Sequence, residues 1–230
     1  MYEPYYNPLI HFLLAQHVEI STITLLLLFP VIVTVVVVLR QIVGIQAFGI
    51  YTPSIITLAF VFIGQQRWSD IKYAIMVYVT VIFVGMMMRY VLKKFRLLYL
   101  PRVAITLTVV SFAVLAILAF GGSTGRTGFS SAPVFPILII IMLVEKFVTV
   151  QIEKGSRTAL LLAVETLFIA LVGYTILSPT TIIGQTIIRF TLIHTWVVLL
   201  IIPINLFIGK WTGLRLSEYL RFRDVIKKIQ

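Results

Sequence analysis

The sequence predicts an all-α polytopic membrane protein with seven transmembrane helices and a C-terminal amphipathic helix. Of its 230 residues, 60% are hydrophobic and only 12% are charged, and the mean hydropathy is +1.07. A water-soluble domain of this length needs far more polar surface. Apolar runs of about 20 residues, the length that a helix needs to cross the hydrocarbon, recur along the chain.

The predicted spans are separated by short connections of polar or helix-breaking residues. The first span contains Pro30, which we expect to kink it, and ends at Arg40. Asp70 precedes the third span, where its charge suits the helix dipole. A basic loop closed by Pro101 separates the third and fourth spans. The seven predicted spans are roughly Ile20–Leu39, Phe48–Gly64, Ile71–Leu92, Val103–Phe120, Pro133–Val150, Thr158–Leu177 and Ile187–Ile208.

Three regions follow from this pattern. Residues 1–19 are predicted to form an interfacial segment outside the cell, and residues 20–210 the seven-helix domain. In residues 211–230 the apolar side chains fall mainly on one helical face and basic side chains on the rest. This pattern is typical of a basic amphipathic helix on the cytoplasmic membrane surface. The pattern leaves open whether this helix docks a partner or only marks topology.

The distribution of Lys and Arg predicts the orientation of the chain. With the N-terminus outside, only four of the 19 basic residues lie on the outer side, and the other 15 lie inside. The outer four are Arg67, Lys72, Arg126 and Arg189. The positive-inside rule therefore favours an outer N-terminus and a cytoplasmic C-terminus. The same asymmetry explains the formal charge of +11, so we expect no nucleic-acid partner.

Two apolar runs begin with helix-breaking residues, and we interpret these breaks as the functional centre. Gly44, Gly49 and Pro53 open the second span, and Pro133 and Pro136 open the fifth. Glycine and proline leave backbone groups that lipid cannot satisfy. Such breaks must therefore face protein or a water-filled cavity.

Spans one to three and spans four to six share a layout. In each triplet the middle span starts at a break, and the third span has a glycine near its end, Gly85 or Gly173. Two triplets of three helices would lie in opposite orientations, as a 3+3 inverted repeat plus one helix. The alternative is that any polytopic chain can be divided in this way.

Charged residues within or near the spans are the remaining candidates. Glu165 lies inside the sixth span, where a carboxylate costs several kcal/mol unless it is protonated, paired or wetted. It could relay a proton or cation or contact a polar substrate, or it could be a protonated group that bonds a neighbouring helix. Structural ion pairing is the favoured interpretation for a second set. Its members are Arg40, Arg89, Arg102, Glu145 and Glu153.

The sequence contains no motif that indicates catalysis. It has no nucleophile elbow, zinc-protease motif or catalytic carboxylate pair, and the loop GGSTGRTG lacks the Gly-Lys-Ser/Thr ending of a phosphate loop. His11, His17 and His194 share no ligand spacing, so we predict no metal site. We expect no cofactor.

Several groups of residues occur in a recognisable order. They are Arg40 to Gly49 with Pro53, Leu100-Pro101-Arg102, Phe135-Pro136, Glu145, Glu153 with Gly155, Glu165-Thr166, Gly213 to Tyr219 and Arg221-Phe222. As an ordered set they resemble a bacterial family described as seven transmembrane helices usually fused to an inactive transglutaminase. The resemblance covers the chain from Ile20 onward. Two features depart from the family pattern. Residues 1–19 precede the first span, where the family usually carries a large outer domain. Lys146 stands where the family pattern leads us to expect Arg.

A more distant likeness concerns Val43-Gly44-Ile45 with Pro53, and Pro133 or Pro136. These residues are similar to the CapC-type membrane subunit of poly-gamma-glutamate synthases. The first family is associated with ATP-grasp glutamate ligases, and the second works beside an amide ligase. The resemblance implies a non-catalytic subunit of the bacterial cytoplasmic membrane that helps to make or export an amino-acid polymer. Its implied partners are the lipid bilayer, a cytoplasmic amide ligase and a separate protein with an outer domain.

Two other functions stay open, a seven-helix receptor that signals through its C-terminal helix and an ion-coupled transporter that uses Glu165. The candidate substrate or passage residues are Gly44, Phe48, Gly49, Pro53, Pro133, Pro136, Glu165 and Thr166.

Overall fold

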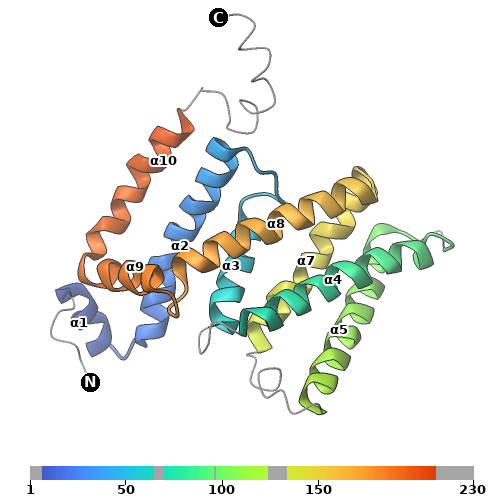
Figure 1. Cartoon of the computed structure of the whole chain (residues 1–230), viewed down its shortest axis with the longest axis horizontal. Coiled ribbons are helices and arrows are strands. Elements are labelled where there is room, and N and C mark those ends of the chain that lie inside the picture. Colours follow the sequence, from blue (N-terminus) through green and yellow to red (C-terminus); the bar gives the residue numbers. More distant parts are fainter. Residues whose placement is uncertain (1–6, 65–69, 96, 124–133, 211–230) are drawn as a thin grey trace, which may run out of the picture. The chain divides into compact units, whose positions relative to one another are not determined.

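The computed structural model describes residues 7–64, 70–95, 97–123 and 134–210, and every regular element within these ranges is a helix (Figure 1). A π-helical turn, η1 (Leu39–Val43), follows α2, and a 3-10 turn, η3 (Thr195–Leu200), precedes α10. The α-helices are α1 (Pro8–Ala15), α2 (Ile20–Val38), α3 (Tyr51–Ile63), α4 (Ile71–Leu92), α5 (Tyr99–Ser123), α7 (Val134–Glu153), α8 (Ser156–Leu177), α9 (Ile182–Ile193) and α10 (Ile201–Gly209).

Within these ranges, five helical stretches are long and apolar enough to cross a membrane. They are Ile20–Val43, Ile71–Leu92, Tyr99–Gly121, Val134–Glu153 and Ser156–Leu177. A sixth candidate arises if α9 and the segment Thr195–Gly209, which meet at a bend of 103°, count as one span. The protein is therefore an all-helical polytopic membrane protein.

The chain divides into two compact units. One is Ala47–Leu171, and the other combines Met1–Gln46 with Val172–Gln230. The first unit contains α3, α4, α5, α7 and most of α8, and the second contains α1, α2, α9 and α10.

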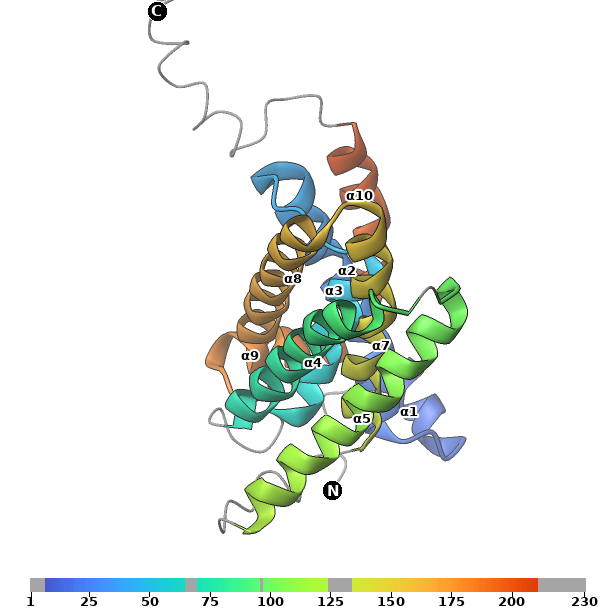
Figure 2. The same ribbon diagram turned by 90° about the vertical axis from the view of Figure 1, so that its right-hand side faces the viewer.

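In the unit Ala47–Leu171, α4 lies against α5 and α7, and α3 packs on α7 (Figure 2). Phe147 of α7 is fully buried, and its ring meets that of Phe48 edge-on with the centroids 6.4 Å apart. The Tyr78 hydroxyl donates a hydrogen bond of 2.8 Å to the carbonyl of Ala163, which ties α4 to α8. Aromatic packing and this hydrogen bond therefore both connect helices of the unit.

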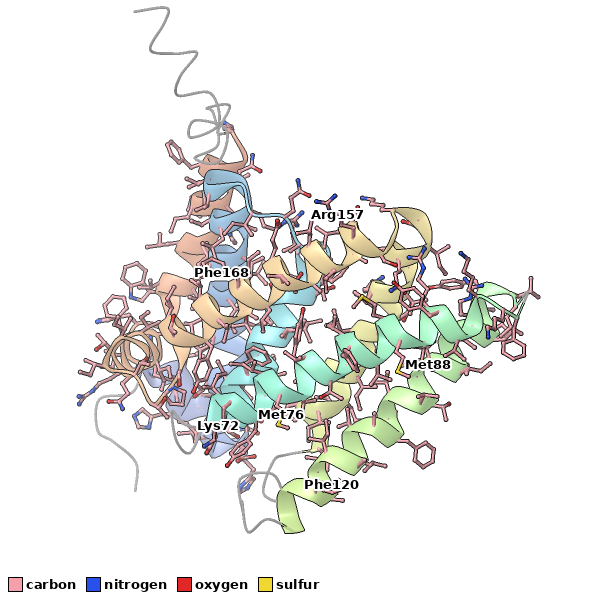
Figure 3. The ribbon with its side chains drawn as sticks, turned by 45° about the vertical axis from the view of Figure 1, so that its right-hand side comes forward. Lys72, Met76, Met88, Phe120, Arg157 and Phe168 are labelled. Atoms are coloured by element: carbon pink, nitrogen blue, oxygen red, sulfur yellow. The ribbon has the colours of Figure 1, made fainter. Side chains whose placement is uncertain are left out.

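The outer faces of these helices carry apolar side chains. Met76, Phe120 and Phe168 project from α4, α5 and α8 (Figure 3) and are largely exposed. Exposed apolar side chains on membrane-length helices are suited to contact with lipid.

In the other unit, α1 packs onto α2 and α9 through a small apolar cluster of Ile10, Ile23 and Leu192. Asn7 caps α1 by accepting from the Leu9 amide at 3.2 Å, and its Nδ2 donates to Thr195 Oγ1 at 2.8 Å. The predicted interfacial segment thus contains a short capped helix.

A polar contact also joins α2 to α10 in this unit. Asn205 Nδ2 donates to Thr34 Oγ1 at 2.9 Å and to the carbonyl of Ile201 at 3.0 Å. Polar side chains on membrane helices commonly bond across helices in this way, because lipid offers them no partner.

The second and seventh predicted spans differ from the observed helices in ways that have a local cause. α3 begins at Tyr51 rather than Phe48, because Gly49 adopts a left-handed φ of 70° that interrupts helix formation. Helical structure near the last span begins at Ile182 rather than Ile187, because Thr181 Oγ1 accepts from the Gly184 amide at 3.0 Å and caps α9. The chain then bends by 103° at His194, whose φ and ψ of −117° and 63° are not helical.

The third predicted span coincides with α4, and the first, fourth, fifth and sixth overlap α2, α5, α7 and α8. Pro133, the GGSTGRTG loop from Thr124 onward and the predicted C-terminal amphipathic helix lie outside the described residues.

The contact between α4 and α7 yields a stability prediction. A Cβ at Gly85 would lie 3.3 Å from the Phe147 ring, which is fully buried and cannot move away easily. The substitution Gly85→Leu would overpack this contact, so we expect a loss of about 1–3 kcal/mol in unfolding free energy. Thermal unfolding of the purified protein in mild detergent measures this loss as a lower midpoint temperature.

The matched control is Gly209→Leu in α10, where a Cβ meets no atom within 4 Å. We expect its midpoint to stay close to that of the wild type. Equal midpoints for the two variants would contradict close α4–α7 packing at Gly85.

Candidate functional site

The break ahead of α3 depends on two glycines with left-handed backbone angles. Gly44 ends η1 with a φ of 88°, and its amide donates to the Leu39 carbonyl at 3.1 Å. Gly49 has a φ of 70°, and its amide donates to the Ala47 carbonyl at 2.8 Å. Residues with a Cβ adopt such angles at a cost, which explains glycine at both positions.

Protein atoms shelter this break where it joins the unit Ala47–Leu171. The side chain of Phe48 is buried, and its amide donates to Thr166 Oγ1 at 3.3 Å. The Thr166 hydroxyl in turn donates to the Leu162 carbonyl at 2.6 Å within α8. The non-helical Phe48 amide therefore has a protein partner, as a backbone group at membrane depth requires.

A cavity of about 350 Å³ opens beside this break, and we call it the lysine pocket. Its walls come from the break, the first turn of α3, the end of α7 and one residue of α8. The lining residues are Ala47, Phe48, Gly49, Tyr51, Thr52, Lys146, Thr149, Val150, Lys154 and Leu162.

The electrostatics of the lysine pocket favour negative charge. Lys146 and Lys154 are its two charged lining residues, and both are exposed. The first turn of α3 adds the positive end of a helix dipole, and among the described residues no side chain caps that end. The hydroxyl group of Thr52 can donate a further hydrogen bond, whereas that of Thr149 already donates to the Glu145 carbonyl at 2.8 Å. The pocket is thus suited to carboxylate or phosphate groups.

The turn between α7 and α8 positions the second lysine. The Lys154 amide donates to the Val150 carbonyl at 2.8 Å, and Gly155 follows with a left-handed φ of 89°. A left-handed glycine is the usual way to end a helix and reverse the chain. With a rise of about 1.5 Å per residue, Lys146 and Lys154 lie roughly 12 Å apart along the α7 axis.

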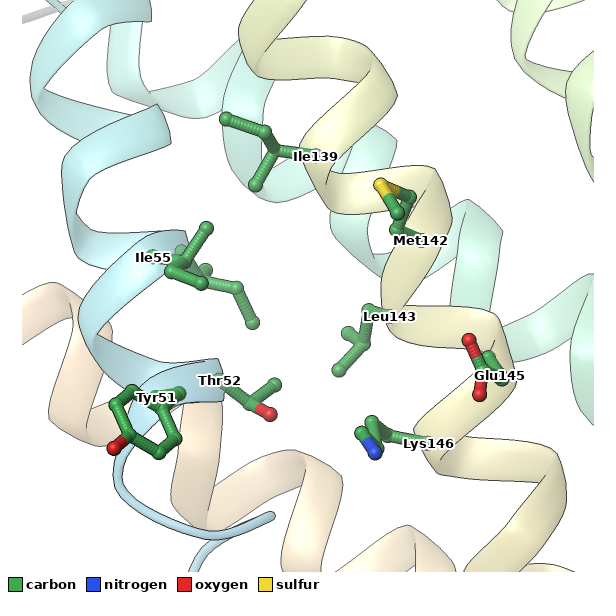
Figure 4. Close-up of a pocket in the computed structure, with 9 residues that line it drawn as sticks. Tyr51, Thr52, Ile55, Ile139, Met142, Leu143, Glu145 and Lys146 are labelled. Carbon is green, nitrogen blue, oxygen red and sulfur yellow. The ribbon is translucent and has the colours of Figure 1, made fainter.

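A second cavity of about 430 Å³ lies between α3 and α7, and we call it the α3–α7 slot. It shares Tyr51, Thr52 and Lys146 with the lysine pocket. Figure 4 shows Lys146 and Leu143 extending from α7 toward α3. Ile55, Ile56, Ile139, Met142, Leu143 and Glu145 complete its lining.

The two proline-led helices run antiparallel in this arrangement, because the start of α3 lies beside Lys146 and its second turn beside Ile139 (Figure 4). Pro53 and Pro136 are both buried and both third in their helices, where an amide has no intrahelical acceptor to lose. Pro136 is absent from the lining of both cavities, which at α7 extends from Ile139 to Lys154.

Glu165 adjoins Thr166 on α8 and is partly buried. Its Oε2 is fully buried and has no hydrogen-bond partner among the described residues. A buried acceptor without a partner is costly and commonly has a functional explanation.

The ion-pair candidates occupy several different places. Arg89 Nη1 donates to the Gln151 carbonyl and to Ser156 Oγ, both at 2.7 Å, so it ties α4 to the α7–α8 turn through neutral acceptors. Arg40 lies in η1, and Arg102 lies near the start of α5. Glu145 lines the α3–α7 slot, and Glu153 ends α7. Within the described ranges, no group of three or more His, Asp or Glu side chains could hold a metal ion.

From the sequence, Lys146 and Lys154 counted as markers of orientation, and Lys146 also as a departure from the family pattern. Tyr51, Thr52 and Thr149 were not predicted as site residues. The spacing of the two lysines carried a usable signal, because helical positions eight apart are rotated by only about 80° and share one broad face. The α3 residues that form the opposite wall of the lysine pocket gave no signal of this kind. They lie about one hundred positions earlier in the chain than the lysines.

The bond between Phe48 and Thr166 predicts a specific effect of removing the hydroxyl. Thr166→Val would leave the Phe48 amide buried without an acceptor, which costs about 1–3 kcal/mol. We expect a lower thermal midpoint and faster hydrogen exchange at the Phe48 amide, measured by mass spectrometry in detergent.

Thr166→Ser is the control, because it keeps an oxygen at the same position. We expect it to retain slow exchange at Phe48. If Thr166→Val also retained slow exchange, the hydroxyl would not be what secures the break.

Comparison with known proteins places the chain in a family. A sequence profile described as 7 transmembrane helices usually fused to an inactive transglutaminase matches residues 9–226. No curated protein and no solved structure matched the chain. The likeness to the poly-gamma-glutamate synthase subunit stays a prediction. The match spans almost the whole chain, which therefore belongs to this family of seven-transmembrane-helix proteins.

Proposed function

We propose that the chain is a non-catalytic membrane subunit that scaffolds or forms the passage for a glutamate-type polymer made by a cytoplasmic ligase. The observation that carries the proposal is the lysine pocket beside the sheltered break ahead of α3. A polymer of glutamate units presents carboxylates at regular intervals. Lys146 and Lys154, roughly 12 Å apart along α7, can each meet one of them.

The proposed topology places this pocket on the side where a ligase would release its product. The chain would cross the bacterial cytoplasmic membrane seven times, with an outer N-terminus and a cytoplasmic C-terminus. The α7–α8 turn with Lys154 then faces the cytoplasm, in agreement with the positive-inside rule. In this count α3, with 13 residues, is a short crossing among the seven.

Matching features of α3 and α7 support the proposed inverted repeat. The two helices are antiparallel, and each carries a buried proline at its third position. Inverted repeats in transporters bring such interrupted helices together around the transported molecule.

The proposed partners follow from the same role. A cytoplasmic amide ligase would supply the polymer, and a separate protein would supply the outer domain. The basic cytoplasmic side would attract both the acidic polymer and acidic surfaces of the ligase.

Binding of a short γ-linked glutamate oligomer tests the proposal. Each exposed ion pair contributes up to about 1 kcal/mol, so the double variant Lys146→Gln/Lys154→Gln should weaken binding about tenfold. Titration calorimetry on the purified full-length protein measures the Kd, and the wild-type Kd should rise with salt because salt screens exposed charges.

The matched control is Lys93→Gln/Lys94→Gln, which removes the same charge from exposed lysines at the end of α4. These lysines do not line the pocket, so we expect the wild-type Kd within about twofold. Equal weakening by both pairs would indicate a diffuse charge effect and would contradict a site at the lysine pocket.

A second candidate function, an ion-coupled transporter, is favoured by one observation. The buried Oε2 of Glu165, which has no partner within the described part of the chain, lies in a membrane-length helix. Carboxylates at such positions in transporters carry protons or coordinate cations.

Uptake by proteoliposomes separates the two functions. If the chain is a transporter, an imposed proton gradient should drive uptake of labelled glutamate, and Glu165→Gln should abolish it because the amide cannot titrate. Glu153→Gln, at an exposed residue at the end of α7, should leave uptake unchanged. Uptake that is absent from the wild type, or equal in Glu165→Gln, would reject the transporter.

A further inference from the structure

The α3–α7 slot has an apolar body and a charged end. Ile56 and Leu143, only 1% and 3% exposed, form its floor, and Met142 is 67% exposed at its edge. Its volume of about 430 Å³ falls in the range of roughly 300–1,000 Å³ that small-molecule sites occupy. On a membrane-length helix this apolar edge faces lipid rather than water.

The charged end combines opposite charges on adjacent residues. Along α7 the lining changes from Ile139, Met142 and Leu143 to Glu145 and Lys146 within two turns. Thr52 of α3 lies across from Lys146 (Figure 4). Glu145 and Lys146 are both exposed, so this end offers one acceptor-only group and one donor-only group.

The charged end of the slot lies at a depth that a lipid headgroup can reach where the bilayer is locally thinner. The first turn of α3 lies level with Lys146, and α3 has 13 residues. Its rise of about 20 Å is shorter than the hydrocarbon thickness of about 30 Å. Bilayers accommodate a short apolar stretch by local thinning, which would bring headgroups to the level of Glu145 and Lys146.

We propose that the slot binds one zwitterionic phospholipid whose headgroup carries a primary amine, such as phosphatidylethanolamine. Its phosphate lies against Lys146, its ammonium donates to Glu145, and one acyl chain follows Ile55, Ile139 and Met142. An anionic headgroup would meet repulsion from Glu145. A choline headgroup has no N–H group to donate to that carboxylate. This site does not depend on the proposed polymer function.

A second apolar groove in the same unit provides a comparison. It lies between α4 and α8, has a volume of about 220 Å³ and includes Val79, Phe83 and Val164 in its lining. Its lining residues carry no charge, so lipid there should be bound without headgroup preference.

Native mass spectrometry tests the proposal on the purified full-length protein. The protein is placed in nanodiscs with equal amounts of phosphatidylethanolamine, phosphatidylglycerol and phosphatidylcholine with identical acyl chains. We expect one retained lipid, with phosphatidylethanolamine enriched about two- to fivefold over each of the others, as an exposed charge pair would give. Enrichment of phosphatidylglycerol, or equal retention of the three lipids, would overturn the proposal.

Variants separate the headgroup from the slot. Glu145→Gln should retain a lipid but lose the preference for phosphatidylethanolamine over phosphatidylcholine. Met142→Trp should fill the slot and remove the retained lipid, whereas Val164→Trp in the α4–α8 groove should keep it. The side chains of Glu145, Met142 and Val164 are exposed, so we expect all three variants to fold. Their thermal midpoints check this expectation. An unchanged preference in Glu145→Gln would contradict the site.

Failure of the lipid proposal and failure of the proposed polymer function would give different results. Glu145 does not line the lysine pocket, so Glu145→Gln should bind the glutamate oligomer with the wild-type Kd. In the wild-type protein, phosphatidylethanolamine preference without oligomer binding would reject only the polymer function. Oligomer binding without phosphatidylethanolamine preference would reject only the lipid site.

Discussion

The central constraint on this protein is that backbone groups within a bilayer need partners from the protein itself. Helices meet this demand internally, and many of the threonine hydroxyls donate to a carbonyl four residues earlier, as Thr57 and Thr106 do. The break ahead of α3 is where helical bonding stops, and the bond from the Phe48 amide to Thr166 replaces it. That bond fixes the break against α8, and the packing of Phe48 on Phe147 fixes it against α7. Both cavities open beside the segment that these contacts hold.

The arrangement of charge near the break follows from the antiparallel packing of α3 and α7. The start of α3, with its uncapped amides, lies at the level where α7 changes from apolar residues to Glu145 and Lys146. The same level thus combines a positive helix end, a carboxylate and an ammonium group. One cavity presents mainly the lysines, and the other presents an apolar slot that ends in both charges. A membrane subunit that handles an acidic polymer can use the first, while a lipid in the second would seal the lateral opening between the two helices.

Family membership and local geometry inform different parts of this interpretation. The family description concerns a membrane domain that is usually fused to an inactive transglutaminase. It names no substrate, so the chemistry of a ligand comes from residues such as Lys146, Lys154 and Glu145. Glu165 adjoins Thr166, and its Oε2 has no hydrogen-bond partner among the residues that the structure describes.

The sequence alone determined the helical class, the membrane setting and most span positions, because apolar runs of sufficient length have few alternatives in a bilayer. Its approximate bounds for the third span agree with α4, since polar groups flank an uninterrupted apolar run. It also located the break ahead of α3, because glycine and proline act on their own backbone. Only the tertiary structure decided that Thr166 is the partner of that break and that Lys146 and Lys154 share a cavity with α3. It alone showed the bend at His194 and the shorter α3. These features depend on contacts between distant segments, and the composition and periodicity of one segment carry no information about which other segment will pack against it.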